Sequence, residues 1–155
     1  MLGSAGNELL EEDRTAFQPM FATVQESDTA PPNCDVLVVY LQLDSEGHVV
    51  GCADGLRDII QKSGAQIAIV GSDNQPGRYV AGGKRTGYPP VNLAMTLQRK
   101  GAAFSRFFAQ LFDRMSRGST MLLAWVELAP QRPGAAHENC PEIIFVAEIS
   151  HIVFQ

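Results

Sequence analysis

The longest amphipathic pattern in the chain lies between Asn92 and Arg117. Its apolar side chains recur every three or four positions, the spacing of one helical face, at Leu93, Leu97, Phe104, Phe107, Phe108, Leu111, Phe112 and Met115. On the charged side, Asp113 precedes Arg117 by four residues, which favours a helical ion pair, and Gly118 follows as a left-handed cap residue. We predict one helix over 92–117, whose phenylalanine stripe must be covered by the β-like runs before and after it.

Two continuous apolar runs predict buried strands. The first, DVLVVYLQL at 35–43, is apolar on both faces at its start, which is typical of a central strand rather than an edge strand. The second, QIAIV at 66–70, follows a helical pattern at 54–63, for which Asp54 is the expected N-cap and Gly64 the end. A strand–helix–strand unit normally joins parallel strands, so we expect these two strands to be parallel neighbours.

The remaining apolar runs predict a third strand and a C-terminal strand or hairpin. MLLAWVEL at 121–128 is interpreted as the third strand, and residues 142–147 and 149–154 as one strand or two. The order of elements favours an α/β fold, with a single three-layer domain and a mainly parallel central sheet. Helices 54–63 and 92–117 are its expected crossovers, and the C-terminal strand or hairpin is expected to be antiparallel. The edge of that last strand is a candidate for pairing with a second copy in a homodimer.

The first 33 residues differ in charge from the rest of the chain. They hold six acidic residues and one arginine, which accounts for the whole formal charge of −5. A short helix is expected to begin at Asn7 and to end or bend at Pro19, and ESDTAPPN at 26–33 has the composition of a linker. We therefore expect an acidic, flexible N-terminal extension at 1–33 and an α/β domain at 34–155. Such an extension is either a solvated aid to solubility or a partner-binding or autoinhibitory arm.

Composition narrows the class of protein further. No apolar run in the 155 residues reaches the roughly 18 positions of a membrane span, and the N-terminus lacks the basic and apolar regions of a secretory signal. Three cysteines form an odd, sparse set, unlike a disulfide framework, so we expect a cytoplasmic location. After residue 33 the acids and bases balance, which argues against nucleic-acid binding through a basic face. We expect no membrane association either.

The most distinctive polar stretch is the Gly- and Pro-rich loop GSDNQPGRYVAGGKRTGYPPV at 71–91. It follows the second predicted strand, and ligands in α/β sheets bind beyond the carboxyl ends of parallel strands. Flexible backbone, clustered cations and the predicted helix start near Val91 together favour an anion or phosphate site, built from Ser72, Asp73, Asn74, Arg78, Lys84 and Arg85. The alternative is a surface loop whose cations are simply solvated, and neither the phosphate-loop motif nor the dinucleotide motif is present.

Two carboxylates are weak candidates for acid–base catalysis. Asp73 comes just after a predicted buried strand and could act, or bind a metal, beside Asp44, which follows the first strand. Both lie in ordinary turn sequences, which gives the alternative interpretation. Glu127 lies late in the predicted third strand on an otherwise apolar face, near the expected site. Its alternative is exposure at the rim of the sheet.

One cysteine and one histidine form a further candidate pair. Cys52 precedes a predicted helix start, where the helix dipole favours a thiolate, and His48 lies four residues upstream as a possible base. A small buried cysteine and a surface histidine are the alternative. His137 and Cys140 form a His-x-x-Cys pair, which is at most half of a zinc site. We expect no metal site and no cofactor.

Functions from different classes remain open at this point. The first is a ligand-binding or protein-interaction module whose site is built from the 71–91 loop, because the sequence holds no complete catalytic constellation. The alternative is an enzyme acting on an anionic small molecule, phosphate-bearing or nucleotide-like, which the loop cations would hold. A cysteine hydrolase that uses Cys52 is the third hypothesis.

Overall fold

A computed structural model describes residues 7–25, 27, 33–44, 48–71, 87–96, 102–129 and 143–154. These residues fall into two compact units. The sheet unit holds every strand and the helix α2, and it ends at residue 148. The helical unit holds α1, α4 and α5 together with residues 149–154. Each unit has a core of its own composition.

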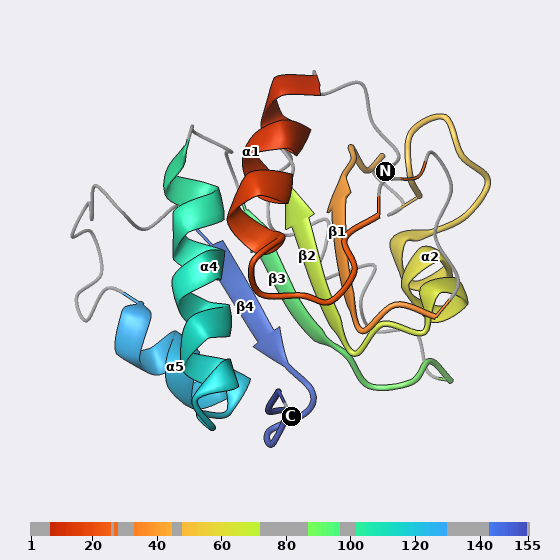
Figure 1. Ribbon diagram of the computed structural model, residues 1–155. Helices are drawn as coiled ribbons and strands as arrows, with labels where there is room; N and C mark the ends of the chain where they lie inside the picture. Colours follow the sequence, from red (N-terminus) through yellow and green to blue (C-terminus); the bar gives the residue numbers. More distant parts are fainter. Residues whose placement is uncertain are drawn as a thin grey trace. The chain divides into compact units, whose positions relative to one another are not determined.

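The sheet unit is a four-stranded mixed sheet in the order β1-β2-β3-β4 (Figure 1). Its strands are β1 (Val36–Tyr40), β2 (Ile67–Gly71), β3 (Asn92–Thr96) and β4 (Ile143–Ala147). The first three are parallel, and β4 runs antiparallel to β3. The predicted α/β class, the parallel pairing of the first two strands and the antiparallel C-terminal strand are therefore confirmed.

The first strand is not the central one. In the order of described strands β1 is an outer member, and β2, which is buried at all five positions, lies between β1 and β3. The prediction of a central strand at 35–43 is therefore wrong. Alternate side chains of β1, such as Leu37 and Val39, are buried while Val36 and Val38 are half-buried. The second face of β1 is half-buried, and this is enough to explain why apolar residues occupy successive positions along the strand.

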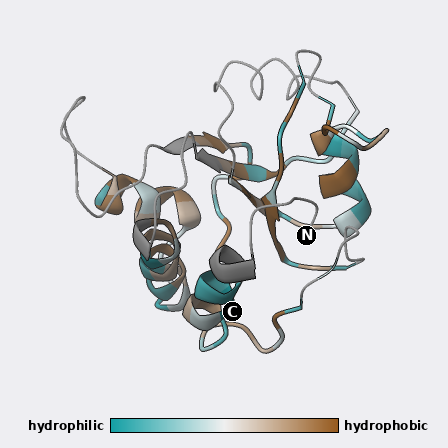
Figure 2. Ribbon diagram, turned by 90° about the horizontal axis from the view of Figure 1, so that it is seen from above, coloured by the Kyte–Doolittle hydropathy of each residue, from teal (hydrophilic) through white to brown (hydrophobic). Residues whose placement is uncertain are grey.

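Helix α2 (Leu56–Ser63) confirms the predicted helix at 54–63. Its N-cap is Gly55 rather than the expected Asp54, and the Asp58 carboxylate accepts a hydrogen bond from the Gly55 N–H at 2.9 Å. At the other end Gly64 takes the predicted left-handed conformation, with φ of 71°. Figure 2 shows apolar and polar stretches alternating along this helix, as expected for an element with one buried face.

The core of the sheet unit is aliphatic. Branched side chains and alanines from α2, the strands and the segment after β1 make one buried cluster, including Val39, Leu56, Ile59, Ala68, Val70 and Leu93. Branched side chains suit the pleated surface because few rotamers are lost when they pack there.

The predicted helix at 92–117 is only partly correct. Asn92–Thr96 forms β3, which pairs with β2 on one side and with β4 on the other, and helix α4 begins at Ala102 and ends at Ser116. Leu93 fits the helical spacing of the later apolar residues by coincidence. The five residues of β3 are too few to distinguish a helical period from a strand period. Two ladders of backbone hydrogen bonds decide the structure instead.

The second half of the predicted helix is confirmed in its details. The Arg117 guanidinium contacts the Asp113 carboxylate at 3.0 Å, four residues apart on α4. Gly118 has φ of 93° and donates its N–H to the Met115 carbonyl at 3.0 Å. The residues predicted to need cover, Phe104, Phe108 and Leu111, are all fully buried.

The predicted third strand at 121–128 is wrong, because Met121–Leu128 is the helix α5. Thr120 is its N-cap, and the threonine hydroxyl oxygen accepts a hydrogen bond from the Leu123 N–H at 3.2 Å. Most residues of this run are good helix formers and only Val126 is β-branched. Its apolar character on all sides was therefore mistaken for a buried strand.

Aromatic rings fill the centre of the helical unit. The ring of Phe112 on α4 lies 5.7 Å from that of Phe17, the last residue of α1 (Asn7–Phe17), and 5.2 Å from that of Phe21. Phe154 is 5.5 Å from Phe112, so the end of α1, the segment after it and the C-terminal segment all contact one ring of α4. Trp125 of α5 packs edge-on against Phe107 at 5.3 Å.

Candidate functional site

The carboxyl ends of the parallel strands are level with one another. Tyr40 pairs with Gly71 and Gly71 with Thr96, so β1, β2 and β3 all end on one line of the sheet. This edge is the usual place for ligands in α/β proteins. Ser72 follows Gly71 directly in the chain. The residues predicted to bind an anion lie outside the described residues: Ser72, Asp73, Asn74, Arg78, Lys84 and Arg85.

A close contact between a ring and a glycine marks this edge. A Cβ added to Gly71 would lie 2.5 and 2.6 Å from two ring carbons of Tyr40. The tyrosine is buried, and the Leu41 N–H donates to the Gly71 carbonyl at 3.2 Å. Only glycine therefore fits at the end of β2 with the ring in this position.

One of the features that predicted an anion site, a helix N-terminus near Val91, is absent from the structure. Val91 leads into the strand β3 and not into a helix, so a helix N-terminus near Val91 contributes nothing to this site. The described strands also follow one another in sequence order across the sheet. Among them there is no reversal of direction of the kind that opens a crevice in doubly wound sheets. The level strand ends and the loop composition remain as support.

A buried arginine ties three elements of the sheet unit together. The Arg57 Nη1 of α2 donates to Glu148 Oε2 at 3.1 Å, and its Nη2 donates to Oε1. Glu148 follows β4, and its Oε2 also accepts the N–H of Val91, just before β3, at 2.9 Å. Sequence reasoning missed this cluster. The signal available was a lone carboxylate at position 148 between two apolar runs.

The net effect of these contacts is to lower the pKa of Glu148. Desolvation raises the pKa of this carboxyl, but the hydrogen bonds from Arg57 and from the Val91 N–H, together with the charge of Arg57, outweigh it. The carboxylate is therefore held ionised, and its oxygens are used within the fold. We interpret the Arg57–Glu148 pair as structural.

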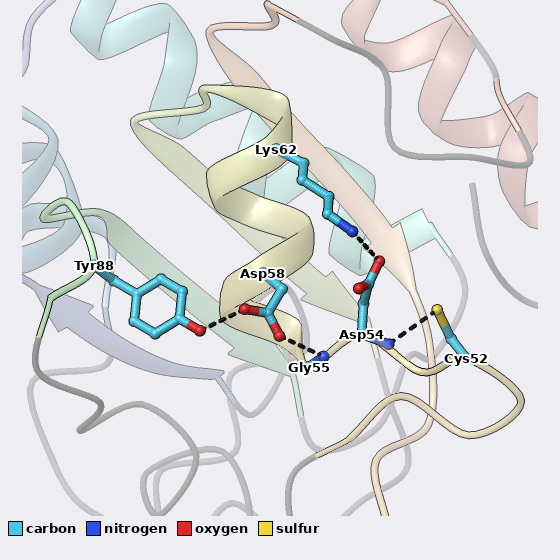
Figure 3. Close-up of polar contacts among 6 residues, drawn as sticks. All are labelled: Cys52, Asp54, Gly55, Asp58, Lys62 and Tyr88. Atoms are coloured by element: carbon cyan, nitrogen blue, oxygen red, sulfur yellow. Dashed lines mark hydrogen bonds and ion pairs between the residues drawn. The ribbon is translucent and has the colours of Figure 1, made fainter.

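The first turn of α2 carries a second polar contact (Figure 3). The Tyr88 hydroxyl donates to Asp58 Oδ1, while the other oxygen of Asp58 accepts the Gly55 N–H. The segment before β3 is thereby joined to the helix start. Asp58 acts here as a cap, since both of its oxygens bind groups of the protein itself.

Asp54 and Cys52 lie next to each other before the same helix (Figure 3). The Lys62 ammonium lies 2.5 Å from the Asp54 carboxylate, and this hydrogen bond raises the pKa of the lysine. The Cys52 sulfur accepts the N–H of Asp54 at 3.4 Å. Figure 3 shows the thiol on the opposite side of Asp54 from the contact between Asp58 and Tyr88.

His48 and Cys52 have different partners. The His48 N–H donates to Asp44 Oδ1 at 2.9 Å, and its Nδ1 lies 3.6 Å from Oδ2 of the same carboxylate. Cys52 instead packs against the aliphatic core, in a turn where its N–H donates to the Val49 carbonyl at 2.9 Å. These contacts agree with the alternative of a small core cysteine and a surface histidine. The hypothesis of a nucleophile and its base gains no support from them.

The remaining cysteines and the predicted half of a zinc site also gain no functional support from the described residues. Burial raises the pKa of the Cys34 thiol, which outweighs its hydrogen bond with Ser63. His137 and Cys140 lie outside the described residues. In the described ranges no three His, Cys, Asp or Glu side chains are grouped as a metal would require.

Glu127 lies on a helix, not at the end of a strand. It is exposed on α5 and forms an ion pair with Arg114 of α4. The reason for proposing it as an acid or base was its place at the carboxyl end of a third strand. That reason disappears with the strand.

Comparison with known proteins adds no family. No family model matches the chain, and comparisons with curated proteins and with solved structures found no match. No helix in the described part of the chain is long and apolar enough to span a membrane. Function is therefore inferred from the residues and their contacts alone.

Proposed function

We propose that the chain is a binding module for a small anionic ligand, and that its site is built from the 71–91 loop beside the ends of β1, β2 and β3. The single observation that carries this proposal is the level ending of the three parallel strands at Tyr40, Gly71 and Thr96. Ligands of α/β sheets are held at such an edge, where loops from several strands begin together.

The basic residues of the 71–91 loop indicate a negatively charged ligand. Arg78, Lys84 and Arg85 follow the end of β2 in a segment rich in glycine, which allows backbone N–H groups to approach a ligand. Charge-assisted hydrogen bonds from such cations are strongest to phosphate and carboxylate groups. Ser72 and Asn74 are suitable additional donors. A phosphate-bearing or nucleotide-like molecule fits this set best.

Thermal unfolding in the presence of candidate ligands tests the proposal. Inorganic phosphate, adenosine monophosphate and glucose 6-phosphate at millimolar concentration are expected to raise the melting temperature of the full chain. The triple variant R78A/K84A/R85A should lose that rise. The matched control R106A/R114A/R117A removes three cations of α4 and its end and should keep it. No rise with any of the probes would contradict the proposal.

The second candidate is an enzyme acting on the same ligand class. Asp73 is the second residue after the end of β2, which is where acids and bases of α/β enzymes commonly lie. Incubation of the chain with adenosine monophosphate or glucose 6-phosphate separates the two candidates. A binding module leaves the compound unchanged, whereas an enzyme consumes it and the variant D73N binds without turnover.

Two finer predictions remain part of this proposal. We place the protein in the cytoplasm, because its cysteines are few and free thiols are found at Cys34 and Cys52. We also keep a homodimer through the edge of β4, which is an outer strand in the described order.

A further inference from the structure

The segment 87–91, which leads into β3, is held on the first turn of α2 at two points. The Tyr88 hydroxyl donates to Asp58 Oδ1 (Figure 3). The Val91 N–H donates at 2.9 Å to Glu148 Oε2, and this carboxylate is paired with Arg57. Because Arg57 and Asp58 are consecutive residues of α2, a single helical turn holds the segment both directly and through Glu148.

Tyr88 is the anchored side chain of this segment. Gly87, Pro89 and Pro90 are exposed, whereas Tyr88 is half-buried. The second oxygen of Asp58 accepts the N–H of the N-cap residue of α2 at 2.9 Å, so the carboxylate that receives the Tyr88 hydroxyl is itself held at the start of the helix. A hydrogen bond to a carboxylate is stronger than one between neutral groups. This contact therefore ties the ring to α2.

Two prolines restrict the chain between Tyr88 and β3. Pro89 and Pro90 have their φ angles fixed by their rings, and successive prolines favour an extended conformation with little freedom. They are followed by Val91 and then by Asn92, the first residue of β3, whose N–H donates to the Gln66 carbonyl at 2.9 Å. The position of Tyr88 is therefore restricted from two sides, by the sheet through the prolines and by α2 through the hydroxyl.

Tyr88 also closely follows two of the predicted ligand-binding cations. Lys84 and Arg85 precede it by four and three residues in the sequence. Three residues of chain span at most about 11 Å, so an anchor at Tyr88 limits the space open to the Arg85 backbone. Ordering a loop during binding reduces affinity, and a loop that is already restricted in the free protein loses less conformational entropy.

We propose that Tyr88 is a positioning residue of the ligand site. Its hydrogen bond to Asp58 restricts the loop before ligand arrives, and the loop cations then bind an anion at a smaller entropic cost. This inference rests on the proposed function, since it concerns the same 71–91 loop. Tyr88 acts through the loop and not by contact with the ligand.

Titration of the full chain with adenosine monophosphate, followed by amide NMR, tests the inference. Tyr88→Phe removes one oxygen atom and keeps the ring, and it should raise the dissociation constant by about five- to tenfold, as expected for the loss of one hydrogen bond. The matched control is Ser63→Ala, which removes a buried hydroxyl at the opposite end of α2, where it donates to the Ile60 carbonyl at 2.7 Å. The control should lower the melting temperature and leave the affinity unchanged.

A double-mutant cycle connects the effect to Asp58. Asp58→Ala removes the acceptor and should also weaken the binding of adenosine monophosphate, while circular dichroism checks that the helices are retained. Because both changes break the same contact, Tyr88→Phe should have little further effect on affinity in the Asp58→Ala background.

The outcomes separate this inference from the proposed function. Equal affinity of the wild type and Tyr88→Phe would overturn the inference and leave the proposed function standing. An equal loss of affinity in Ser63→Ala would also overturn it, because general destabilisation would then explain the effect, and so would additive losses in the cycle. A wild type that does not bind adenosine monophosphate would contradict the proposed function, and this inference with it.

Discussion

The two units of this chain have cores built from different kinds of side chain. The sheet unit packs branched aliphatic side chains of β1, β2, β3 and α2. The helical unit holds seven of the eight phenylalanines of the chain and its tryptophan. Short helices such as α1 and α5 offer few positions for burial, and an aromatic ring buries more area at each position than an aliphatic chain does.

The units also use charge differently. In the sheet unit the buried Arg57 pairs with the partly exposed Glu148, and the contacts of this carboxylate join α2 and the segments beside β3 and β4. In the helical unit the pairs Arg114–Glu127 and Asp113–Arg117 lie in solvent on the surface. Buried charges must be fully paired, whereas exposed pairs contribute little. The helical unit also has one buried polar contact, from the Ser105 hydroxyl of α4 to the Asp13 carboxylate of α1. The difference is that the sheet unit joins its elements through a buried arginine, and the helical unit through its rings and this single contact.

The largest effect is expected at the aromatic centre of the helical unit. Phe112→Ala removes the ring that Phe17, Phe21 and Phe154 share. We expect a loss of about 3–5 kcal/mol in the free energy of unfolding, measured by urea denaturation. Amide hydrogen exchange should show the loss in α1 and α4 first. Equal loss of protection in β2 would show that the two cores are not separate.

The next effect concerns the ion pair between the buried Arg57 and Glu148. Glu148→Ala leaves the Arg57 guanidinium and the Val91 N–H without this carboxylate, and we expect a loss of about 3 kcal/mol in urea denaturation. Glu148→Gln keeps an acceptor for the Val91 N–H and should cost clearly less. Equal stability of wild type and both variants would mean that the pair contributes nothing.

The same carboxylate predicts a dependence on pH. Because the folded pKa of Glu148 lies below its ordinary value of 4.5, its contribution is complete above the unfolded pKa. It is lost as the pH falls through the folded pKa. Stability of the wild type should therefore fall more steeply below about pH 4.5 than that of Glu148→Gln, in urea titrations at a series of pH values. Parallel curves would contradict this assignment.

A smaller effect is expected where the ring of Tyr40 covers Gly71. Gly71→Ala forces the tyrosine ring to move and should cost about 1–3 kcal/mol. In the background Tyr40→Leu the same change should cost less, because the flat ring is gone. A double-mutant cycle with no coupling between the two positions would contradict the contact.

The smallest effect is expected at the exposed pairs of the helical unit. Glu127→Gln breaks the contact with Arg114. It should change the free energy of unfolding by less than about 1 kcal/mol. Glu148→Gln in the sheet unit is the natural comparison for this variant. A larger loss at Glu127 than at Glu148 would reverse the proposed contrast between the units.

Much of the sheet unit could be predicted from the sequence. The runs at 35–43 and 66–70 are rich in β-branched residues, and the helical pattern between them ends at a glycine that takes the expected left-handed conformation. Local chemistry and tertiary structure agree there. The level strand ends follow from the pairing register, which depends on partners far apart in the chain and has no local signal.

The failures lie where local patterns were ambiguous. NLAMT at 92–96 continues the helical spacing of α4, and only its pairing with β2 and β4 makes it a strand. Gly101 was the available signal, because glycine inside a predicted helix weakens it. For α5 the missed signal was Thr120, whose side chain caps the helix. Of the candidate site residues, Glu127 lost its rationale with that error.

The central claim is that ligand binding belongs to the carboxyl edge of the sheet unit, and a titration followed by amide NMR tests it most directly. Adenosine monophosphate added up to about ten millimolar should shift the amide signals of Leu41 and Gly71, which lie at that edge. The signals of Phe108 and Leu111 in the helical unit should stay in place. Shifts confined to the helical unit, or no shifts in either unit, would contradict the account.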